Sequence, residues 1–390
     1  MFNANTFAQQ ALEKGAKLSI IDEEEYISEN TLLVKDVLIT LQNLAKFHRQ
    51  YLNIPVIGIT GSNGKTTTKE LMHCVLSKKF NTKATLGNLN NHIGVPLTLL
   101  SISNQHEIAI IEMGANHQKE IEFLSDLALP NIGYVTNFGK AHLEGFGGIE
   151  GVIKGKSELY DNLKKYGKKA LVNANDPIQV KKTADMDRIT FGALGSTYPF
   201  HGFTYGSENL VGIRYNETEI KSKLTGSYNI NNLGAALALG LYYNIPDENI
   251  KDALENYRPA NSRSQWFETS KNRILLDAYN ANPSSMALAI QNFSEIKAPS
   301  KWVILGDMFE LGIYAQEEHH KIATAAKEAG FEKVILAGAN FSSIQNLNDS
   351  QTFSSTQDVE TFLKDLQPQN KTILIKGSRG MALEKLLPLL

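Results

Sequence analysis

The fold of this chain is decided by the stretch Ile57-Gly-Ile-Thr-Gly-Ser-Asn-Gly-Lys-Thr-Thr67. It follows a short apolar run at residues 54–57 and precedes a helix-compatible run at residues 68–78, so we expect a strand that turns into a helix here. Such a turn can hold phosphate, because glycines let backbone N–H groups converge on an anion and the helix N-terminus adds partial positive charge. Lys65 adds a full charge, and Thr66 can offer its hydroxyl to Mg²⁺.

The spacing of this loop departs from the standard phosphate-binding pattern, because Gly-x₄-Gly-Lys would need glycine in place of Ile59. A glycine-rich turn that only reverses the chain is the plain alternative. Glycines, an asparagine, a lysine and two threonines in one strand-to-helix turn favour a phosphate loop. The candidate phosphate contacts are Gly61, Asn63, Gly64, Lys65, Thr66 and Thr67.

The composition is that of an ordinary soluble globular protein with two or three domains. Of the 390 residues, 42% are hydrophobic and 21% are charged. The formal net charge of −2, without a basic block, gives no sign of a nucleic-acid partner. Cys74 is the single cysteine, so no disulfide can form within the chain. No apolar run is long enough to span a bilayer, and residues 1–5 lack signal-peptide features, so we expect a cytoplasmic protein without a membrane partner.

Strand candidates and helix-like runs alternate from residue 54 to about residue 257, which is typical of a parallel sheet covered by helices. Ligands gather beyond the carboxyl ends of such strands. Glu112 closes the second strand candidate and His142 follows the third by a short loop, so we expect both beside the phosphate loop. The strand candidates are residues 56–60, 108–113 and 132–137, the added antiparallel strands are 188–192 and 211–220, and the closing helices are 232–243 and 247–257.

A linker at residues 258–262 precedes a second alternating region. Its four apolar strand candidates alternate with four helical runs, which predicts a doubly wound, Rossmann-like domain. No Gly-x-Gly-x-x-Gly turn follows its first strand, so nicotinamide or flavin binding is not indicated. The strand candidates are residues 273–278, 302–306, 333–338 and 372–376, and the helical runs are 285–295, 316–330, 357–366 and 381–390.

We therefore predict an α/β protein with a small N-terminal α/β segment over residues 1–50, a central P-loop-type parallel-sheet domain over 51–258, and a C-terminal Rossmann-like domain over 259–390. The first segment is too short to form an independent core, so we expect it to lean on the next domain. Its predicted elements are helices at residues 6–14 and 37–51 and a strand at 16–21.

A phosphate loop, a carboxylate and a histidine at one edge of a sheet suggest a nucleotide, Mg²⁺ and phosphoryl transfer. Glu112 suits this chemistry because Mg²⁺ prefers hard oxygen ligands. A solvated or hydrogen-bonded carboxylate is the structural alternative. Histidine is a borderline Mg²⁺ ligand, so chemistry alone allows a structural role for His142 equally well.

Several stretches, taken together and in order, closely resemble the Mur ligases from about residue 6 to the C-terminus. Agreement of separate motifs in the expected order is stronger evidence than any one motif. The stretches are Thr60-Gly-Ser-Asn-Gly-Lys-Thr-Thr67, Gly87-Asn-Leu-Asn-Asn-His-Ile-Gly-Val-Pro-Leu-Thr-Leu-Leu100, Glu112-Met-Gly-Ala-Asn116, Asn137-Phe-Gly-Lys-Ala-His-Leu-Glu-Gly-Phe146, Asn173-Ala-Asn-Asp176, Asp277-Ala-Tyr-Asn-Ala-Asn-Pro-Ser-Ser-Met286, Leu305-Gly-Asp-Met308 and Lys376-Gly-Ser-Arg379.

The resemblance implies an ATP-dependent ligase. The stretches at residues 88–91, 279–283 and 376–379 look most like family members that add D-Ala-D-Ala to UDP-N-acetylmuramoyl-tripeptide in peptidoglycan precursor synthesis. In this family ATP phosphorylates the terminal carboxylate, the amine attacks the acyl phosphate, and a tetrahedral intermediate collapses to amide and phosphate. We therefore expect ATP, Mg²⁺ at two sites, these two small-molecule substrates, and a monomer.

The resemblance also implies roles in holding phosphate and metal. Lys65 and the loop N–H groups would hold the ATP phosphates. Thr66 and Glu112 would bind one Mg²⁺, and His142 would join the second.

Lys156, in the run Gly155-Lys-Ser-Glu-Leu-Tyr160, matches the lysine that is carbamylated in this family. Carbamylation would turn a cation into an anion beside the second Mg²⁺. Lys154 is the nearby competitor, and a solvated surface lysine is the plain alternative.

Further contacts are implied on the nucleotide and substrate sides. Tyr228 stands where many members have histidine, which preserves a ring but puts a specific nitrogen contact to adenine in doubt. Arg263, after a hinge, would reach the γ-phosphate only when the domains close. The implied nucleotide contacts are Asn229, Asn232, Arg263, Asp277 and Asn280, and the implied substrate contacts are Asn88, Asn90, Asn91, Lys376, Ser378 and Arg379.

The match with the family fails at the beginning of the chain. Members normally have, upstream, an Asp-Ser-Arg segment and a Phe-Phe-Ala-Leu-x-Gly strand that help to bind uridine diphosphate, and this chain starts downstream of both. We therefore expect ATP chemistry to survive better than affinity for the uridine end.

Three rival interpretations stay open. They are a folylpolyglutamate synthase-like ligase, a diaminopimelate-adding ligase, and a non-catalytic nucleotide-binding relative. The second is disfavoured because the C-terminal part lacks an Asp-Asn-Pro-Arg type of stretch. The third is also disfavoured, because a non-catalytic relative would not need all of the five residues Lys65, Thr66, Glu112, His142 and Lys156.

Overall fold

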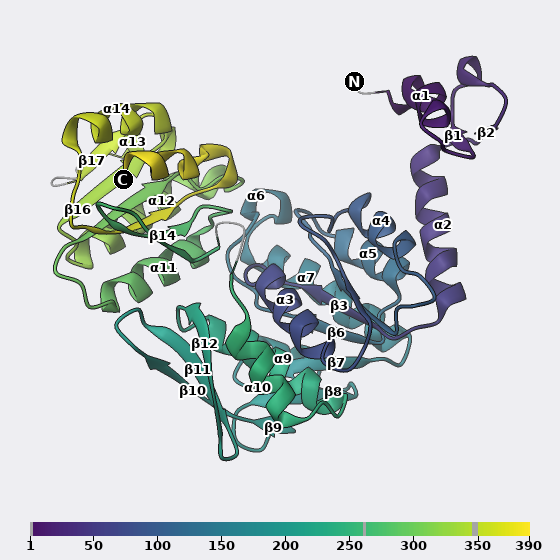
Figure 1. Cartoon of the computed structure of the whole chain (residues 1–390), viewed down its shortest axis with the longest axis horizontal. Coiled ribbons are helices and arrows are strands. Elements are labelled where there is room, and N and C mark those ends of the chain that lie inside the picture. The colour runs from purple at the N-terminus through teal and green to yellow at the C-terminus, as the bar shows by residue number, and fades with distance from the viewer. Residues whose placement is uncertain (1–2, 260–262, 345–349) are drawn as a thin grey trace.

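The computed structural model describes residues 3–259, 263–344 and 350–390. Figure 1 shows a small N-terminal segment, a central body and a C-terminal body, one after the other along the chain. The predicted linker at residues 258–262 lies mostly outside the described residues, and the boundaries at residues 50 and 258 stay predictions.

In the described part of the chain, the central body contains seven parallel strands in the order β4-β5-β3-β6-β7-β8-β9. The strand that leads into the phosphate loop, β3, lies between β5 and β6. Because parallel strands end at the same edge, the loops after β3, β5 and β6 meet there, as predicted. The strands are β3 (Val56–Thr60), β4 (Thr82–Ala84), β5 (Ile108–Glu112), β6 (Ile132–Val135), β7 (Lys169–Asn173), β8 (Arg188–Gly192) and β9 (Tyr198–Pro199).

Helices bury both faces of this sheet. Ile57 and Ile59 of β3 join the core beneath α3 and α9, whereas Val56 joins the core beneath α5 and α7. No helix in the described ranges is long and apolar enough to cross a membrane. The helices are α3 (Lys65–Leu76), α4 (Gly94–Leu100), α5 (Glu120–Ala128), α6 (Leu143–Phe146), α7 (Ile149–Lys165), α8 (Pro177–Lys182), α9 (Asn229–Tyr242) and α10 (Asp247–Asn256).

The prediction of an antiparallel strand at residues 188–192 is wrong. This strand, β8, pairs in parallel with β7, because the intervening α8 returns the chain to the edge from which β7 began. The predicted hairpin at residues 211–220 is confirmed, and it belongs to a separate antiparallel sheet beside α9 and α10 (Figure 1). The strands of that sheet are β10 (His201–Tyr205), β11 (Leu210–Tyr215) and β12 (Thr218–Thr225).

The C-terminal body has its own sheet, in the order β13-β14-β18-β15-β16-β17 within the described residues. The four predicted strands are confirmed as its parallel centre, and the short edge strands β13, which is antiparallel, and β17 were not anticipated. Helices α11 and α12 cover one face and α14 the other. The elements are β13 (Gln265–Glu268), β14 (Arg273–Asp277), β15 (Lys301–Gly306), β16 (Lys333–Ala337), β17 (Gln351–Phe353), β18 (Thr372–Lys376), α11 (Pro283–Glu295), α12 (Ala315–Glu328), α13 (Ala339–Ser342) and α14 (Thr356–Leu366).

The last predicted helix, at residues 381–390, is not an α-helix. Two short 3-10 helices, Arg379–Met381 and Leu383–Leu389, stand there instead. Ala382 between them adopts a left-handed backbone with φ 51°, and Pro388 has no N–H to donate to an α-helical ladder.

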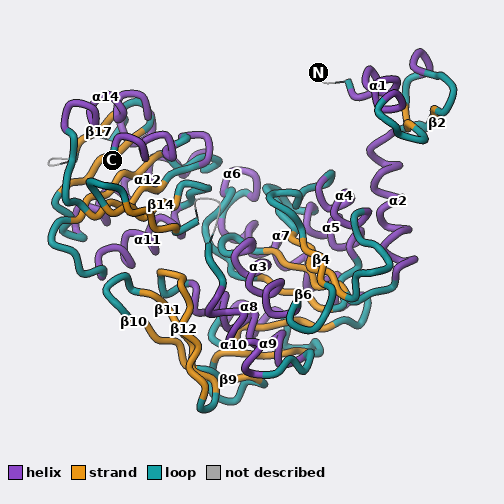
Figure 2. Tube along the Cα trace, in the orientation of Figure 1, coloured by secondary structure: helices purple, strands orange, loops and turns teal. Residues whose placement is uncertain are grey.

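The N-terminal segment holds α1 (Ala8–Glu13) and a parallel pair, β1 (Ser19–Ile21) and β2 (Thr31–Leu33). Figure 2 shows that α2 (Val37–Leu52) links it to the central body, where α2 packs against α4 and α5. The expectation that this segment leans on the next domain is thus confirmed for α2.

Arg49 fastens α2 to the central body. Its side chain is buried, and Nε donates to the Ala128 carbonyl at 2.9 Å, while Nη2 donates to the Leu129 carbonyl and Asn131 Oδ1, both at 3.1 Å. Asn131 Oδ1 also accepts from Val56 N at 2.9 Å, so the same network reaches β3.

Arg49→Met should lower the free energy of unfolding by about 2 kcal/mol or more, because it leaves buried acceptors without donors. Urea denaturation followed by circular dichroism measures the change. Gln50→Met, at an exposed position of the same helix, is the matched control and should stay close to the wild type. Equal stability of the two variants would contradict the assignment.

Candidate active site

The phosphate loop needs glycine at two positions. Gly61 has φ 138°, and a Cβ there would lie 2.0 Å from Thr136 Oγ1. Gly64 has φ 79°, and a Cβ there would lie 2.9 Å from Asn232 Oδ1. Both values of φ belong to the left-handed half of the map, which side chains rarely adopt. The loop therefore takes a backbone shape that only this glycine pattern permits.

The loop after β6 holds the phosphate loop in shape. The Asn63 carbonyl accepts from Thr136 Oγ1 at 2.6 Å and from Asn137 Nδ2 at 3.0 Å, and Asn63 N donates to Asn137 Oδ1 at 3.1 Å. Ser62 Oγ donates to the Gly139 carbonyl at 2.7 Å. These bonds fix the phosphate loop before any ligand arrives.

Two cations without a carboxylate partner in the described residues lie beside the loop. Lys65 Nζ donates to the loop's own carbonyls, at 2.5 Å to Gly61 and 3.3 Å to Ser62. The Arg263 guanidinium stacks 3.7 Å from the Tyr279 ring centroid, and its buried Nε has no hydrogen-bond partner among the residues that the structure describes. Burial lowers the pKa of Lys65, Glu112 opposes this shift, and Arg263 adds to it. An anion would relieve both cations, so the chemistry of this pair suits phosphate.

Glu112, at the end of β5, is almost completely buried with 2% exposure. Its Oε1 accepts from Asn90 Nδ2 at 2.8 Å and from Thr66 Oγ1 at 3.3 Å, and Lys69 Nζ lies 3.8 Å from Oε2. Oε2 has no hydrogen-bond partner among the described residues. A buried carboxylate oxygen without a hydrogen-bond partner in the described residues, beside a threonine hydroxyl, fits an Mg²⁺ site.

His142 lies in the loop between β6 and α6, at the mouth of the same cavity. It adopts a left-handed backbone with φ 53°, a conformation that is costly outside glycine and frequent at functional sites. Its Nδ1 donates to Glu310 Oε2 of the C-terminal body, and this hydrogen bond lowers the pKa of Glu310. Within the described ranges, no group of three or more His, Cys, Asp or Glu side chains could hold a metal by itself. Phosphate oxygens would have to complete a metal site here.

Lys156 on α7 is buried with 1% exposure. Its Nζ donates to the Ala115 carbonyl at 3.0 Å and lies 4.7 Å from the Phe146 ring centroid. Burial, and then the nearby Lys65, hold the pKa of this amine well below its usual range. The plain alternative, a solvated surface lysine, is therefore wrong for Lys156, whereas the competitor Lys154 is exposed.

The nucleotide-side asparagines brace the phosphate loop from α9. Asn232 Nδ2 donates to Asn229 Oδ1 at 2.8 Å, and Thr68 Oγ1 donates to Asn232 Oδ1 at 3.0 Å. Tyr228 beside them shares a 2.8 Å hydrogen bond with Ser264 Oγ, and burial raises the pKa of its phenol. The hydrogen bond to Ser264 thus fixes the orientation of the Tyr228 ring.

The C-terminal body contributes an ion pair at the edge of its sheet. Asp277 and Lys376 are register partners on β14 and β18, and Lys376 Nζ donates to Asp277 Oδ2 at 2.5 Å and to the Asn280 carbonyl at 3.3 Å. Ser378 Oγ accepts from Phe309 N at 3.0 Å, and Arg379 lies 3.4 Å from Glu384. These residues line the cavities between the two bodies.

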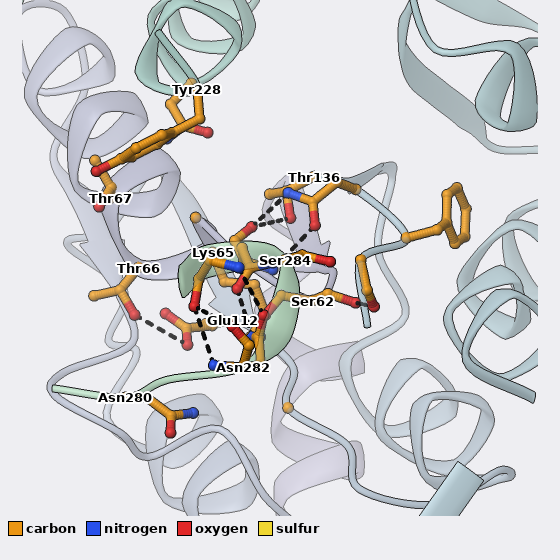
Figure 3. A pocket seen from close by; sticks show the side chains of 18 of the residues that line it. Ser62, Lys65, Thr66, Thr67, Glu112, Thr136, Tyr228, Asn280, Asn282 and Ser284 are labelled. Carbon is orange, nitrogen blue, oxygen red and sulfur yellow. Dashed lines mark hydrogen bonds between the residues drawn. The ribbon is translucent and has the colours of Figure 1, made fainter. Parts of the chain in front are cut away.

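Most of the predicted residues line one cavity of about 1000 Å³, and an adjoining cavity of about 780 Å³ shares Thr66, Asn88, His142, Arg263 and Asn280 with it. Figure 3 shows Lys65, Thr66 and Glu112 beside Asn282 and Ser284 from the C-terminal body. Ser378 and Arg379 line only the second cavity, and Gly61 and Lys156 line neither. The predicted residues that line the first cavity are Asn63, Gly64, Lys65, Thr66, Thr67, Asn88, Asn90, Asn91, Glu112, His142, Asn229, Asn232, Arg263, Asp277, Asn280 and Lys376.

Sequence reasoning missed three polar residues at the site. Lys69 lies one helical turn beyond Thr66, a spacing that could have revealed it. Asn282 Nδ2 donates to Asn63 Oδ1 at 2.7 Å, so the C-terminal body touches the phosphate loop directly. Glu310 reaches His142 across 168 residues of sequence, for which no local signal exists.

Comparison with known proteins gives consistent results. The model of the Mur ligase middle domain matches residues 59–240, and that of the Mur ligase glutamate ligase domain matches residues 262–379. The UDP-N-acetylmuramoyl-tripeptide–D-alanyl-D-alanine ligase of Escherichia coli K12 is 35% identical over 98% of this chain and 87% of its own. MurF from Acinetobacter baumannii superposes with a TM-score of 0.89 at 30% identity, covering 99% of this chain and 87% of that one. MurF from Thermotoga maritima in complex with ADP superposes with a TM-score of 0.85 at 26% identity, covering 98% of this chain and 90% of that one.

Arg263→Ala should weaken the binding of a nonhydrolysable ATP analogue about tenfold, which corresponds to about 1.4 kcal/mol, because a stacked cation beside the loop is lost. Isothermal titration calorimetry measures the affinity. Arg258→Ala removes an exposed arginine from the same part of the chain and serves as the control. If both variants bind the analogue as the wild type does, Arg263 does not contact phosphate.

Proposed function

This chain belongs to the Mur ligase family, and we propose that its cleft joins D-alanyl-D-alanine to UDP-N-acetylmuramoyl-tripeptide with consumption of ATP. The chain is an ATP-dependent peptide ligase of peptidoglycan precursor synthesis. One observation carries the assignment of the chemistry to this cleft. Lys65 and Arg263, without carboxylate partners in the described residues, face the same cavity as the buried Glu112.

The reaction needs positioning and charge stabilisation more than it needs an acid or a base. A carboxylate oxygen of the tripeptide attacks the γ-phosphorus, the bond to the ADP oxygen breaks, and an acyl phosphate forms. The amine of D-Ala-D-Ala then attacks the carbonyl carbon, loses a proton, and phosphate leaves. Lys65, Arg263 and the loop N–H groups would hold the phosphoryl oxygens throughout, where fixed charges contribute most.

Mg²⁺ would be held by oxygen ligands at the phosphate loop. The Thr66 hydroxyl and Glu112 Oε2 fit one ion, because the first is a P-loop type of ligand and the second is a buried oxygen without a hydrogen-bond partner in the described residues. His142 would join a second ion. When bound, these ions neutralise charge on the phosphoryl oxygens.

Lys156 is proposed to be carbamylated. Its neutral amine would attack CO₂, form an N–C bond and lose a proton, which gives an anion where a cation would repel Mg²⁺. The depressed pKa supports this, because only the unprotonated amine can react. Glu120, which lines the first cavity, is the nearby carboxylate that opposes this depression most.

The other residues of the cleft divide between the two ends of the reaction. We assign Asp277 and Asn280 to contacts with the nucleoside. Asn229 and Asn232 would act on the nucleotide indirectly, because they support the phosphate loop. The tripeptide and the dipeptide are assigned to Asn88, Asn90, Asn91, Lys376, Ser378 and Arg379. One chain supplies all of these residues, which supports action as a monomer, and the substrates are small water-soluble molecules, which supports a cytoplasmic enzyme.

Phosphate release should require ATP, UDP-N-acetylmuramoyl-tripeptide and D-Ala-D-Ala together, with the joined product identified by mass spectrometry. Lys65→Ala should slow release by about 100-fold or more, since a fixed charge at the reacting phosphate is lost. Release that ignores the dipeptide rejects the proposal, and glutamate or diaminopimelate as the preferred acceptor would identify a rival ligase.

Lys156→Ala should abolish ligase activity, and acetate or propionate should restore part of it by supplying a carboxylate in place of the carbamate. Lys154→Ala, an exposed neighbour on the same helix, is the control and should keep full activity. Isotopically labelled bicarbonate should give a carbamate NMR signal that only Lys156→Ala loses. Full activity of Lys156→Ala would overturn the carbamylation proposal.

A further inference from the structure

We infer that Glu310 is a positioning residue that orients the His142 imidazole for metal binding across the boundary between the two bodies. This inference rests on the proposed function, because it needs an ion beside His142. It adds a supporting residue from the Asp307–Leu311 loop to a site whose proposed ligands come from the central body.

The contact between these residues is held from both sides. Glu310 Oε2 accepts from His142 Nδ1, and the Glu310 carbonyl accepts from Glu144 N at 3.2 Å. Glu310 has a left-handed backbone with φ 59°, as His142 has on its side with φ 53°. Two strained residues that meet through one hydrogen bond indicate a contact that the surroundings enforce.

The loop that carries Glu310 is anchored by buried groups. Asp307, with 2% exposure, accepts from Asn340 N at 2.8 Å and Phe341 N at 3.1 Å. His319, fully buried, accepts at Nε2 from Met308 N at 2.9 Å. The loop therefore presents Glu310 from a fixed frame and not from a mobile tip.

The loop is also tied to the predicted substrate side of the site. Phe309 N donates to Ser378 Oγ at 3.0 Å, and Ser378 N donates to the Asp307 carbonyl at 3.1 Å. A displacement of the Lys376–Arg379 stretch would thus be passed through these two hydrogen bonds to Asp307 and Phe309, and so to the loop that carries Glu310.

The role of Glu310 follows from the ring nitrogen of His142 to which it is hydrogen-bonded. A metal-binding histidine usually donates its other ring N–H to a carboxylate or carbonyl, which fixes both the tautomer and the ring orientation. In a neutral imidazole whose Nδ1–H donates to Glu310, Nε2 is the nitrogen left to bind an ion. His142 lines both cavities of the cleft, so an ion at Nε2 would lie within reach of the phosphate site.

The simpler explanation is that the pair only holds the two bodies together. Lys140 and Glu318 of α12 form such a pair, at 2.6 Å, across the same boundary, and His142 takes no part in it. Their removal weakens the boundary without freeing the imidazole, so Lys140→Met is the matched control for Glu310→Ala.

The test uses the full chain with Mn²⁺ as the probe, a nonhydrolysable ATP analogue and UDP-N-acetylmuramoyl-tripeptide. Pulsed electron paramagnetic resonance should show a nitrogen hyperfine coupling to Mn²⁺ in the wild type and in Lys140→Met. The coupling should be lost in His142→Ala and weakened in Glu310→Ala. Glu310→Gln, whose amide oxygen can still accept from Nδ1, should keep most of it and guards against a folding defect.

The same variants separate the inference from the proposed function. The Mg²⁺ concentration for half-maximal phosphate release should rise about 10- to 100-fold in Glu310→Ala and stay unchanged in Lys140→Met. Equal effects of Glu310→Ala and Lys140→Met on the coupling and on this concentration would overturn the inference. A wild type without nitrogen coupling would overturn it too, while dipeptide-dependent phosphate release in that same wild type would leave the ligase function standing.

Discussion

A carboxylate taken almost completely out of water, Glu112 at the end of β5, is the constraint on which the rest of the site depends. A buried charge is stable only when other polar groups compensate for the lost water. Here Asn90 and Thr66 donate hydrogen bonds to Oε1, and Lys69 Nζ lies 3.8 Å from Oε2. Each comes from a segment that starts at the carboxyl edge of the central sheet, so the carboxylate gathers these segments around the phosphate loop.

The parts of the fold that follow from local chemistry could be predicted from the sequence. Apolar runs gave the strands β3, β5 and β6, and the rule that parallel strands end together placed Glu112 and His142 at one edge. The direction of β8 depends on a crossover through α8, and the 3-10 conformation at the end of the chain depends on Pro388. Neither feature follows from an alternating pattern of strands and helices. The contact between Glu310 and His142 arises from the packing of two separate sheets, which no local propensity encodes.

The cleft is a shared structure, with the phosphate loop on one side and the Asp277–Ser285 and Asp307–Leu311 loops on the other. Asn282 bonds Asn63, Ser284 accepts from Lys140 N at 2.8 Å, and Glu310 bonds His142. These three contacts link the C-terminal body to the phosphate loop and to His142. Chemistry in this enzyme therefore depends on the relative placement of two sheets as well as on the ligands themselves.

Lys65 donates hydrogen bonds to the carbonyls of its own loop, at Gly61 and Ser62. An incoming phosphate must break those bonds before it gains the lysine. A triphosphate would offer several oxygens and would offset the repulsion between Lys65 and Arg263. The lysine that would bind phosphate therefore also belongs to the hydrogen-bond network of its own loop, so its ligand contacts and the conformation of the loop are coupled.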